Sequence, residues 1–165
     1  MLTFVLSAAL AQSPSTTCTA DGKPWQVGDV NGNVVTNQLL GRRLTLNVYD
    51  QSKEQLPYLQ LSAAWKGLEH GKNVKVSAKN AKPNSPLEAM WTATPPGPLL
   101  PPDFEQAGLH FLEQGQLLFV GFDAGASTVS LTFEGSLREG SPGKPKAHVI
   151  KVKCAFTALK VSVSP

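Results

Sequence analysis

Residues 43–65 read RLTLNVYDQSKEQLPYLQLSAAW and contain two runs in which apolar and polar side chains alternate. The first run covers 43–50 and the second covers 58–65. A repeat of two residues places alternate side chains on opposite faces of an extended strand. Each run therefore predicts a β-strand with one buried face and one polar face.

The same alternation recurs along the chain and predicts an all-β fold. It is found in 25–36, 73–79, 87–93, 108–123, 127–137 and 150–163, whereas no segment keeps a 3.6-residue repeat over ten residues. About eight or nine short strands with frequent turns are typical of an antiparallel β-sandwich. We therefore expect a sandwich of the jelly-roll or immunoglobulin-like kind, with a barrel as the alternative.

Several positions are predicted to interrupt these strands. Asn31-Gly32 stands between apolar runs and predicts a hairpin turn, because both residues tolerate a positive φ. Gln114-Gly115 can turn the chain within 108–123, and Gly135 can mark a bulge. The apolar positions change parity near Thr157, which predicts a bulge or a bend at that point.

The composition fits one folded domain of low charge. The chain has 165 residues, of which 41% are hydrophobic and 16% are charged, with a net charge of +3. This length and apolar content suffice for one core, so residues 12–165 are expected to form a single β-sandwich domain. The net charge is too small to indicate nucleic-acid binding by itself.

The first residues, 1–11, read MLTFVLSAALA and form an uncharged, mostly apolar start. Its last residues, Ala9-Leu10-Ala11, fit the small-x-small pattern of signal-peptide cleavage. Eleven residues are too few to span a bilayer, which takes about 20. We expect a signal-peptide remnant, with an N-terminal strand or helix of the domain as the alternative. A signal implies a secreted, periplasmic or cell-envelope protein without a membrane span.

The sequence contains two cysteines, Cys18 and Cys154, which lie near opposite ends of the chain. In an exported protein, two cysteines most simply form one disulfide. The alternative is a pair of buried free thiols. Neither cysteine belongs to a C-x-x-C pair or has a histidine nearby in sequence, so a catalytic thiol is not expected.

Three short motifs carry a resemblance to a known class of proteins. They are Asp21-Gly22-Lys23-Pro24-Trp25, Phe133-Glu134-Gly135-Ser136-Leu137 and Lys153-Cys154-Ala155-Phe156. Together they resemble small secreted bacterial β-domains that open with Asp/Asn-Gly-Lys-x-Trp, which are often lipoproteins of unknown function. The resemblance implies a β-sandwich and a cell-envelope setting, and it supplies no catalytic residues. This chain has no lipid-anchor cysteine directly after its apolar start.

A polar face of the strands 43–50 and 58–65 is a candidate binding surface. If the two strands form a hairpin that pairs Val48 with Leu59, the polar side chains also pair across it. The face then consists of Thr45, Asn47, Tyr49, Tyr58, Gln60 and Ser62. Aromatic, amide and hydroxyl groups with almost no charge suit glycans. Ordinary cross-strand pairing on a solvated or covered sheet is the alternative.

Lysines form a second candidate surface. Lys75 and Lys79 share the outward face of one predicted strand, and Lys151 and Lys153 share that of another. If these strands are neighbours, the four lysines form a basic stripe for an anionic envelope polymer or an acidic partner. The alternative is that they are solvated side chains that keep edge strands from pairing.

No catalytic motif is present, since the sequence lacks a Gly-x-Ser-x-Gly elbow, a phosphate-binding loop and a dinucleotide fingerprint. Asp103, Glu105 and Glu113 follow the proline-rich segment 94–102 and could supply a paired acid and base, although solvated loop acids are commoner. No metal or cofactor is expected, because the histidines lack metal-ligand spacing: His70, His110 and His148. The tryptophans fall in the apolar phase of their strands, which predicts core positions for Trp25, Trp65 and Trp91.

The leading interpretation is a secreted or cell-envelope module that has a structural or binding role and no enzymatic activity. One alternative is a glycan-binding module that uses the polar face of 43–50 and 58–65. Another is a hydrolase, or an inhibitor of an envelope enzyme, in which the segment 94–102 shapes or enters a cleft. The sequence does not identify the partner: a glycan and an envelope protein are the candidates. Nucleic acid is not expected, because no aromatic side chains are interleaved with the basic ones.

Overall fold

The computed structural model of the chain describes residues 13–51, 58–65, 73–82, 84–92, 109–140 and 148–164. The expected signal-peptide remnant, 1–11, lies outside the described residues. The proline-rich segment 94–102, the acids Asp103 and Glu105, and His70 also lie outside them.

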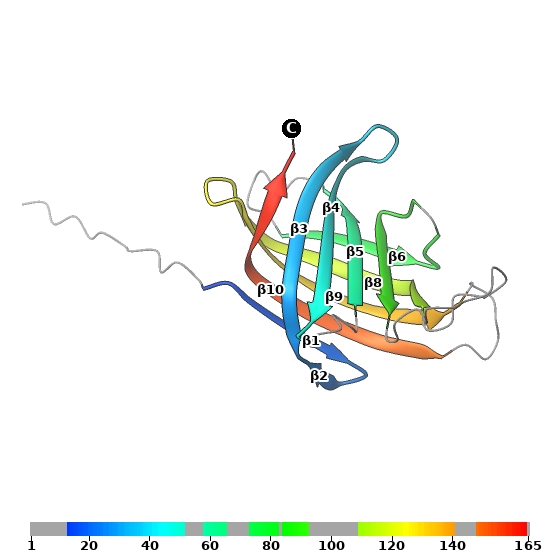
Figure 1. The fold of residues 1–165 in the computed structure, drawn as a ribbon. Helices are drawn as coiled ribbons and strands as arrows, with labels where there is room; N and C mark the ends of the chain where they lie inside the picture. The colour runs from blue at the N-terminus through cyan, green and yellow to red at the C-terminus, as the bar shows by residue number, and fades with distance from the viewer. Residues whose placement is uncertain are drawn as a thin grey trace, which may run out of the picture.

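The described residues form ten strands (Figure 1) and no helix, so they include no helix that is long and apolar enough to cross a membrane. The strands are β1 (Ser15–Ala20), β2 (Lys23–Trp25), β3 (Val27–Asn37), β4 (Gly41–Asp50), β5 (Tyr58–Ala64), β6 (Val74–Lys79), β7 (Leu87–Thr92), β8 (Leu109–Asp123), β9 (Thr128–Glu139) and β10 (Val149–Val163). Buried and more exposed positions alternate along β4 and β5, as the sequence pattern requires. The all-β prediction is confirmed.

Seven of these strands close into a barrel. Their order is β10-β3-β4-β5-β7-β8-β9, and pairing of β9 with β10 completes the circle. The other three strands, β1, β2 and β6, are paired outside this circle. In Figure 1, β3, β4 and β5 cross β8, β9 and the first part of β10 at a steep angle, whereas the end of β10 runs alongside β3. The expected sandwich is not confirmed, and the closed circle corresponds to the barrel that the sequence left open as the alternative.

The two longest strands change neighbours at a bulge, and these changes make the closure possible. β8 pairs first with β7 and then with β6, and its register shifts between Leu112 and Gln114. β10 pairs first with β1 and then with β3, and its register shifts between Phe156 and Leu159. An extra residue bends a strand and increases its twist, so each bulge forms a corner of the barrel. The interruption predicted near Thr157 is confirmed.

Asn31-Gly32 does not form the predicted hairpin turn, because both residues lie inside β3. Gly32 serves a close approach between strands instead. A Cβ atom at Gly32 would lie 2.8 Å from Val161 Cγ1 and 2.9 Å from Leu46 Cδ2. The glycine therefore lets β3 pack against side chains of its two neighbours.

Gln114-Gly115 is likewise part of a continuous strand, β8, and not a turn. Gly115 pairs directly with Gly135 of β9. A Cβ atom would lie 2.9 Å from Leu112 Cδ1 at Gly115 and 2.8 Å from it at Gly135. The glycine pair thus makes room for one leucine side chain. A bulge is present close to Gly135, but the extra residue belongs to the neighbouring strand β8 and not to β9, which contains Gly135.

The barrel core is apolar, and tryptophans lie toward both ends of it. Trp25 packs against Trp91 with ring centroids 4.8 Å apart. Trp65 directly follows the last residue of β5, and its ring centroid lies 5.7 Å from that of Phe119 and 5.1 Å from that of Phe122. Their exposed fractions are 8% for Trp25, 8% for Trp65 and 4% for Trp91, so the predicted core positions are confirmed.

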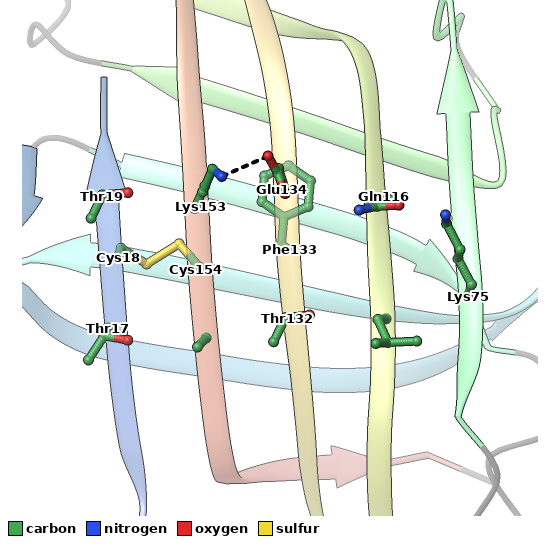
Figure 2. A pocket seen from close by; sticks show the side chains of 12 residues that line it. Thr17, Cys18, Thr19, Lys75, Gln116, Thr132, Phe133, Glu134, Lys153 and Cys154 are labelled. Atoms are coloured by element: carbon green, nitrogen blue, oxygen red, sulfur yellow. Dashed lines mark ion pairs between the residues drawn. A yellow bond between two sulfur atoms is a disulfide. The ribbon is translucent and has the colours of Figure 1, made fainter. Parts of the chain in front are cut away.

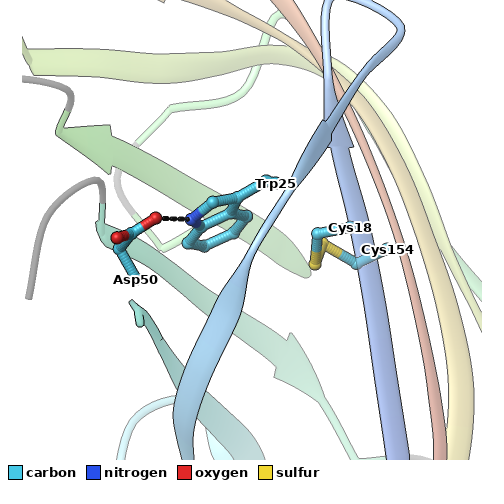
Figure 3. Close-up of a disulfide and its surroundings, with 4 residues drawn as sticks. All are labelled: Cys18, Trp25, Asp50 and Cys154. Carbon is cyan, nitrogen blue, oxygen red and sulfur yellow. Dashed lines mark hydrogen bonds between the residues drawn. A yellow bond between two sulfur atoms is a disulfide. The ribbon is translucent and has the colours of Figure 1, made fainter. Parts of the chain in front are cut away.

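The predicted disulfide joins Cys18 of β1 to Cys154 of β10, and the two residues are directly opposite each other (Figure 3). They are 136 residues apart in sequence, so the bond ties the first strand to the last. The next strand, β2, carries Trp25, whose Nε1 donates a hydrogen bond to Asp50 Oδ2 at 2.8 Å (Figure 3). The disulfide and the indole together hold the β1–β2 hairpin against the barrel.

Candidate binding surface

One outward face of the barrel wall extends over five neighbouring strands, β6, β8, β9, β10 and β1. The register of these strands aligns their outward side chains in rows that run across the sheet. The middle row consists of Ser77, Gln116, Glu134, Lys153 and Thr19. The rows on either side of it consist of Lys79, Gln114, Ser136 and Lys151, and of Lys75, Leu118, Thr132, Ala155 and Thr17.

Two adjoining hollows lie over these rows, with volumes of about 560 and 460 Å³. Both are lined by side chains of β6, β8, β9 and β10, so they form one depression, part of which is shown in Figure 2. We call this depression the lysine groove. Lys75 and Lys79 on β6 form one border, Lys151 and Lys153 on β10 form the opposite side with Thr17 and Thr19 of β1 beyond them, and β8 and β9 form the floor between the two lysine columns.

The four lysines share one face, but they do not form a single stripe. β8 and β9 lie between β6 and β10, so the strands that carry the lysines are not neighbours. Three inter-strand spacings of about 4.8 Å separate the two lysine columns by about 14 Å. Alternation in the sequence fixes which face a side chain occupies, whereas the distance between the columns depends on strand order.

The lysine groove has an excess of positive charge. Lys153 Nζ lies 2.9 Å from Glu134 Oε1, and both side chains are more than half exposed, at 62% and 55%. Within the described part of the chain, Lys75, Lys79 and Lys151 make no ion pair. An exposed ion pair like that of Lys153 with Glu134 is worth at most about 1 kcal/mol, so Lys153 can exchange Glu134 for another anion at little cost.

A second outward face lies on β4 and β5, whose pairing confirms the predicted hairpin register: Val48 lies opposite Leu59 and Tyr49 lies opposite Tyr58. We call this surface the tyrosine face. It consists of Thr45, Asn47, Tyr49, Tyr58, Gln60 and Ser62, all of them half-buried. The two tyrosine rings are 5.1 Å apart and inclined at 38°, so they form a tilted pair and not a flat platform.

Hydrogen bonds order the tyrosine face around Asn47. The Tyr58 hydroxyl donates to Asn47 Oδ1 at 2.7 Å, and Gln60 Nε2 donates to the same oxygen at 3.2 Å. Burial raises the pKa of the Tyr58 hydroxyl above its ordinary value of 10.0, and the neighbouring Tyr49 adds to the rise. Tyr58 is therefore a neutral hydrogen-bond donor at physiological pH.

The tyrosine face also contains charge that the sequence did not lead us to expect. Arg43 is 6% exposed and donates to Ser62 Oγ at 2.9 Å and to Glu88 Oε2 at 3.1 Å. Glu88 belongs to β7 and lies opposite Ser62. Arg43 is two residues before Thr45 and so shares its parity, but its ion-pair partner Glu88 is 45 residues away in sequence and could not be inferred from the pattern. The ion pair, in which Arg43 is buried and Glu88 is about one third exposed, occupies Ser62 and limits that end of the face.

Two histidines that are far apart in sequence meet at the start of β8 and β10. His110 Nε2 and His148 Nδ1 are 3.2 Å apart, and His110 is 5% exposed. The described residues contain no group of three or more His, Cys, Asp or Glu side chains placed to hold a metal ion. Among the candidate acids, Glu113 Oε1 lies 2.7 Å from Arg138 Nη2, so its carboxylate is engaged in an ion pair.

Comparison of the chain with protein-family models, with curated proteins and with solved structures finds no match.

Proposed function

We propose that this protein is a secreted or cell-envelope binding module without enzymatic activity, and that it holds an anionic ligand in the lysine groove. One observation carries the proposal: the register places four lysines on one outward face, around a depression whose floor bears amide and hydroxyl groups. A disulfide that joins the first and last strands is typical of exported proteins and supports the location.

The charge arrangement favours binding over a purely structural role. The middle of the sequence, 83–137, contains no lysine or arginine, so the groove draws its lysines from two separate segments. Clustered charge of one sign raises the local concentration of a ligand of opposite charge and accelerates its association. Because the lysines are exposed, this attraction is screened over about 8–10 Å at physiological salt. Binding should accordingly weaken as salt is raised.

Retention on an immobilised polyanion tests the proposal. The variant Lys75→Gln/Lys79→Gln removes one border of the lysine groove, and Lys23→Gln/Lys160→Gln removes the same charge from exposed positions outside it. We expect the first variant to elute at clearly lower salt than the wild type, and the second to elute close to it. Equal shifts for both variants would mean that retention reflects net charge alone, and the groove assignment would then be rejected.

A glycan site on the tyrosine face is a second candidate, favoured by the ordering of Tyr58 and Gln60 around Asn47. Aromatic rings with oriented amides and hydroxyls supply apolar contact and hydrogen bonds to a sugar. The double variant Tyr49→Ala/Tyr58→Ala should abolish glycan-array signals that Lys75→Gln/Lys79→Gln leaves unchanged. Signals that survive the double tyrosine substitution would remove this candidate.

A further inference from the structure

We infer that the ligand of the lysine groove is a linear acidic polysaccharide that lies across the strands, with neutral sugar residues between its acidic ones. This inference rests on the proposed function, because it names the ligand of the same site. It is carried by three features of the groove: the distance between the lysine columns, the chemistry of the floor and the position of Glu134.

The distance between the columns selects for an extended ligand. The columns on β6 and β10 are about 14 Å apart across the sheet. A single carboxylate, sulfate or phosphate reaches only one column, whereas a chain with repeated anionic groups reaches both. The rows also run across the strands, from β6 to β1. In the row of Lys79, Gln114, Ser136 and Lys151, a chain that follows the row meets a lysine on β6 and another on β10.

The floor of the groove favours a saccharide over a peptide. β9 is paired with β8 on one edge and β10 on the other, and the β8 segment below the groove is paired with β6 and β9. Their main-chain donors and acceptors are therefore used in the sheet, and a peptide cannot bind there as an added strand. The floor offers side chains instead: the amides of Gln114 and Gln116 and the hydroxyls of Thr132 and Ser136. Such groups can bond both hydroxyls and carboxylates.

The described residues of the floor also lack the side chains that single-stranded nucleic acid needs. Binding of that kind uses aromatic or arginine side chains on which bases stack. Among the described residues, the one aromatic residue that lines the groove is Phe133, whose side chain is packed in the core at 2% exposure. Leu118 and Ala155 instead provide a small apolar surface on one side of the middle row, suited to the C–H face of a sugar ring.

Glu134 determines the pattern of charge that the groove accepts. It lies in the middle row between Gln116 and Lys153, and its side chain is 55% exposed. A carboxylate at this position repels a ligand that is anionic at every residue. It accepts hydrogen bonds from hydroxyl groups, so a neutral sugar residue fits over it while acidic residues lie at the lysine borders.

Isothermal titration with four probes tests the inference: hyaluronan oligosaccharides, which alternate acidic and neutral residues, polygalacturonate, poly-L-glutamate of matched charge, and inorganic phosphate. We expect hyaluronan to bind at least tenfold more tightly than poly-L-glutamate. Removal of either lysine column, by Lys75→Gln/Lys79→Gln or by Lys151→Gln/Lys153→Gln, should weaken that binding at least tenfold. The control Lys23→Gln/Lys160→Gln should change it less than twofold.

Glu134→Gln supplies the decisive comparison, because it removes the central carboxylate. It should strengthen binding of polygalacturonate and poly-L-glutamate several-fold and leave hyaluronan binding unchanged or weaker. Poly-L-glutamate that binds as tightly as hyaluronan, or an equal gain for all polymers in Glu134→Gln, overturns the polysaccharide inference and leaves the groove as an anion site. Binding of none of the four probes overturns the proposed function as well.

Discussion

Replacement of both cysteines, Cys18→Ser/Cys154→Ser, should destabilise the protein substantially. The disulfide closes a loop with a sequence separation of 136, which contains every strand from β2 to β9. The chain-entropy relation for a loop of this size gives about 5 kcal/mol of stabilisation, through restriction of the unfolded chain. Measured values are commonly lower, so we expect the free energy of unfolding to fall by about 2–5 kcal/mol. That range corresponds to a fall in Tm of roughly 5–20 °C for a domain of this length.

The same variant should leave the native structure intact at room temperature. Six residue pairs hold β1 against β10, and they do not depend on the sulfur atoms. Trp25 of the adjoining strand stays packed on Trp91 and bonded to Asp50. The tryptophan emission of the folded variant should therefore match that of the oxidised wild type.

Urea unfolding followed by tryptophan fluorescence measures both expectations. The oxidised wild type and the double serine variant are compared, and wild type in the presence of a reductant serves as the control for the substitutions themselves. A loss below about 1 kcal/mol would refute the loop-closure argument. A red-shifted emission before the main transition would show that the β1–β2 hairpin detaches first, contrary to the packing argument.

Three further changes test the packing and the ionisation described above. Gly32→Ala should lower the free energy of unfolding by about 1–3 kcal/mol, because the added Cβ would meet side-chain atoms at 2.8 and 2.9 Å. The control Gly121→Ala adds a Cβ with no atom within 4 Å and should lower the free energy of unfolding far less. Urea unfolding compares the two variants. Trp25→Phe should cost about 1.5 kcal/mol or more through loss of the hydrogen bond to Asp50, and thermal unfolding of the variant checks this. Since the folded-state pKa of Tyr58 is raised above 10.0, the unfolded chain loses this proton first. The contribution of Tyr58 to the free energy of unfolding is then constant below about pH 10 and declines as the pH rises through the folded-state pKa. Urea unfolding across that pH range should show that the free energy of unfolding declines less steeply for Tyr58→Phe than for the wild type.

Local patterning made much of the secondary structure predictable. The strands β4 and β5 are adjacent in sequence, and one face of each is apolar, so one choice of pairing fixed the whole hairpin register. The bulge near Thr157 was also visible, because apolar residues on both sides of it change parity. The equivalent bulge on β8 lies between Leu112 and Gln114, directly before Gln114-Gly115, which was read as a turn. Residues 113–116 carry no apolar side chain that would show the change of parity.

Closure of the barrel could not be predicted from these patterns. It depends on β8 and β10 exchanging one neighbour for another along their length, and the partners are brought together by contacts far apart in sequence. Asn31-Gly32 illustrates the limit. A glycine that permits a positive φ and a glycine that permits close packing look the same in a sequence, and only the position of Val161 distinguishes them.

The lysine groove combines a predictable part with an unpredictable one. Alternation placed each lysine on an outward face, because one-residue shifts would have put its charge in the core. Strand order then decided that β8 and β9 lie between the two columns, which turns a stripe into a groove with a floor. That floor brings Glu134 beside Lys153, and neither residue differs in sequence from an ordinary solvated side chain. The specificity that we propose for this surface would arise from register, because three strand pairings align residues that are of ordinary type in the sequence.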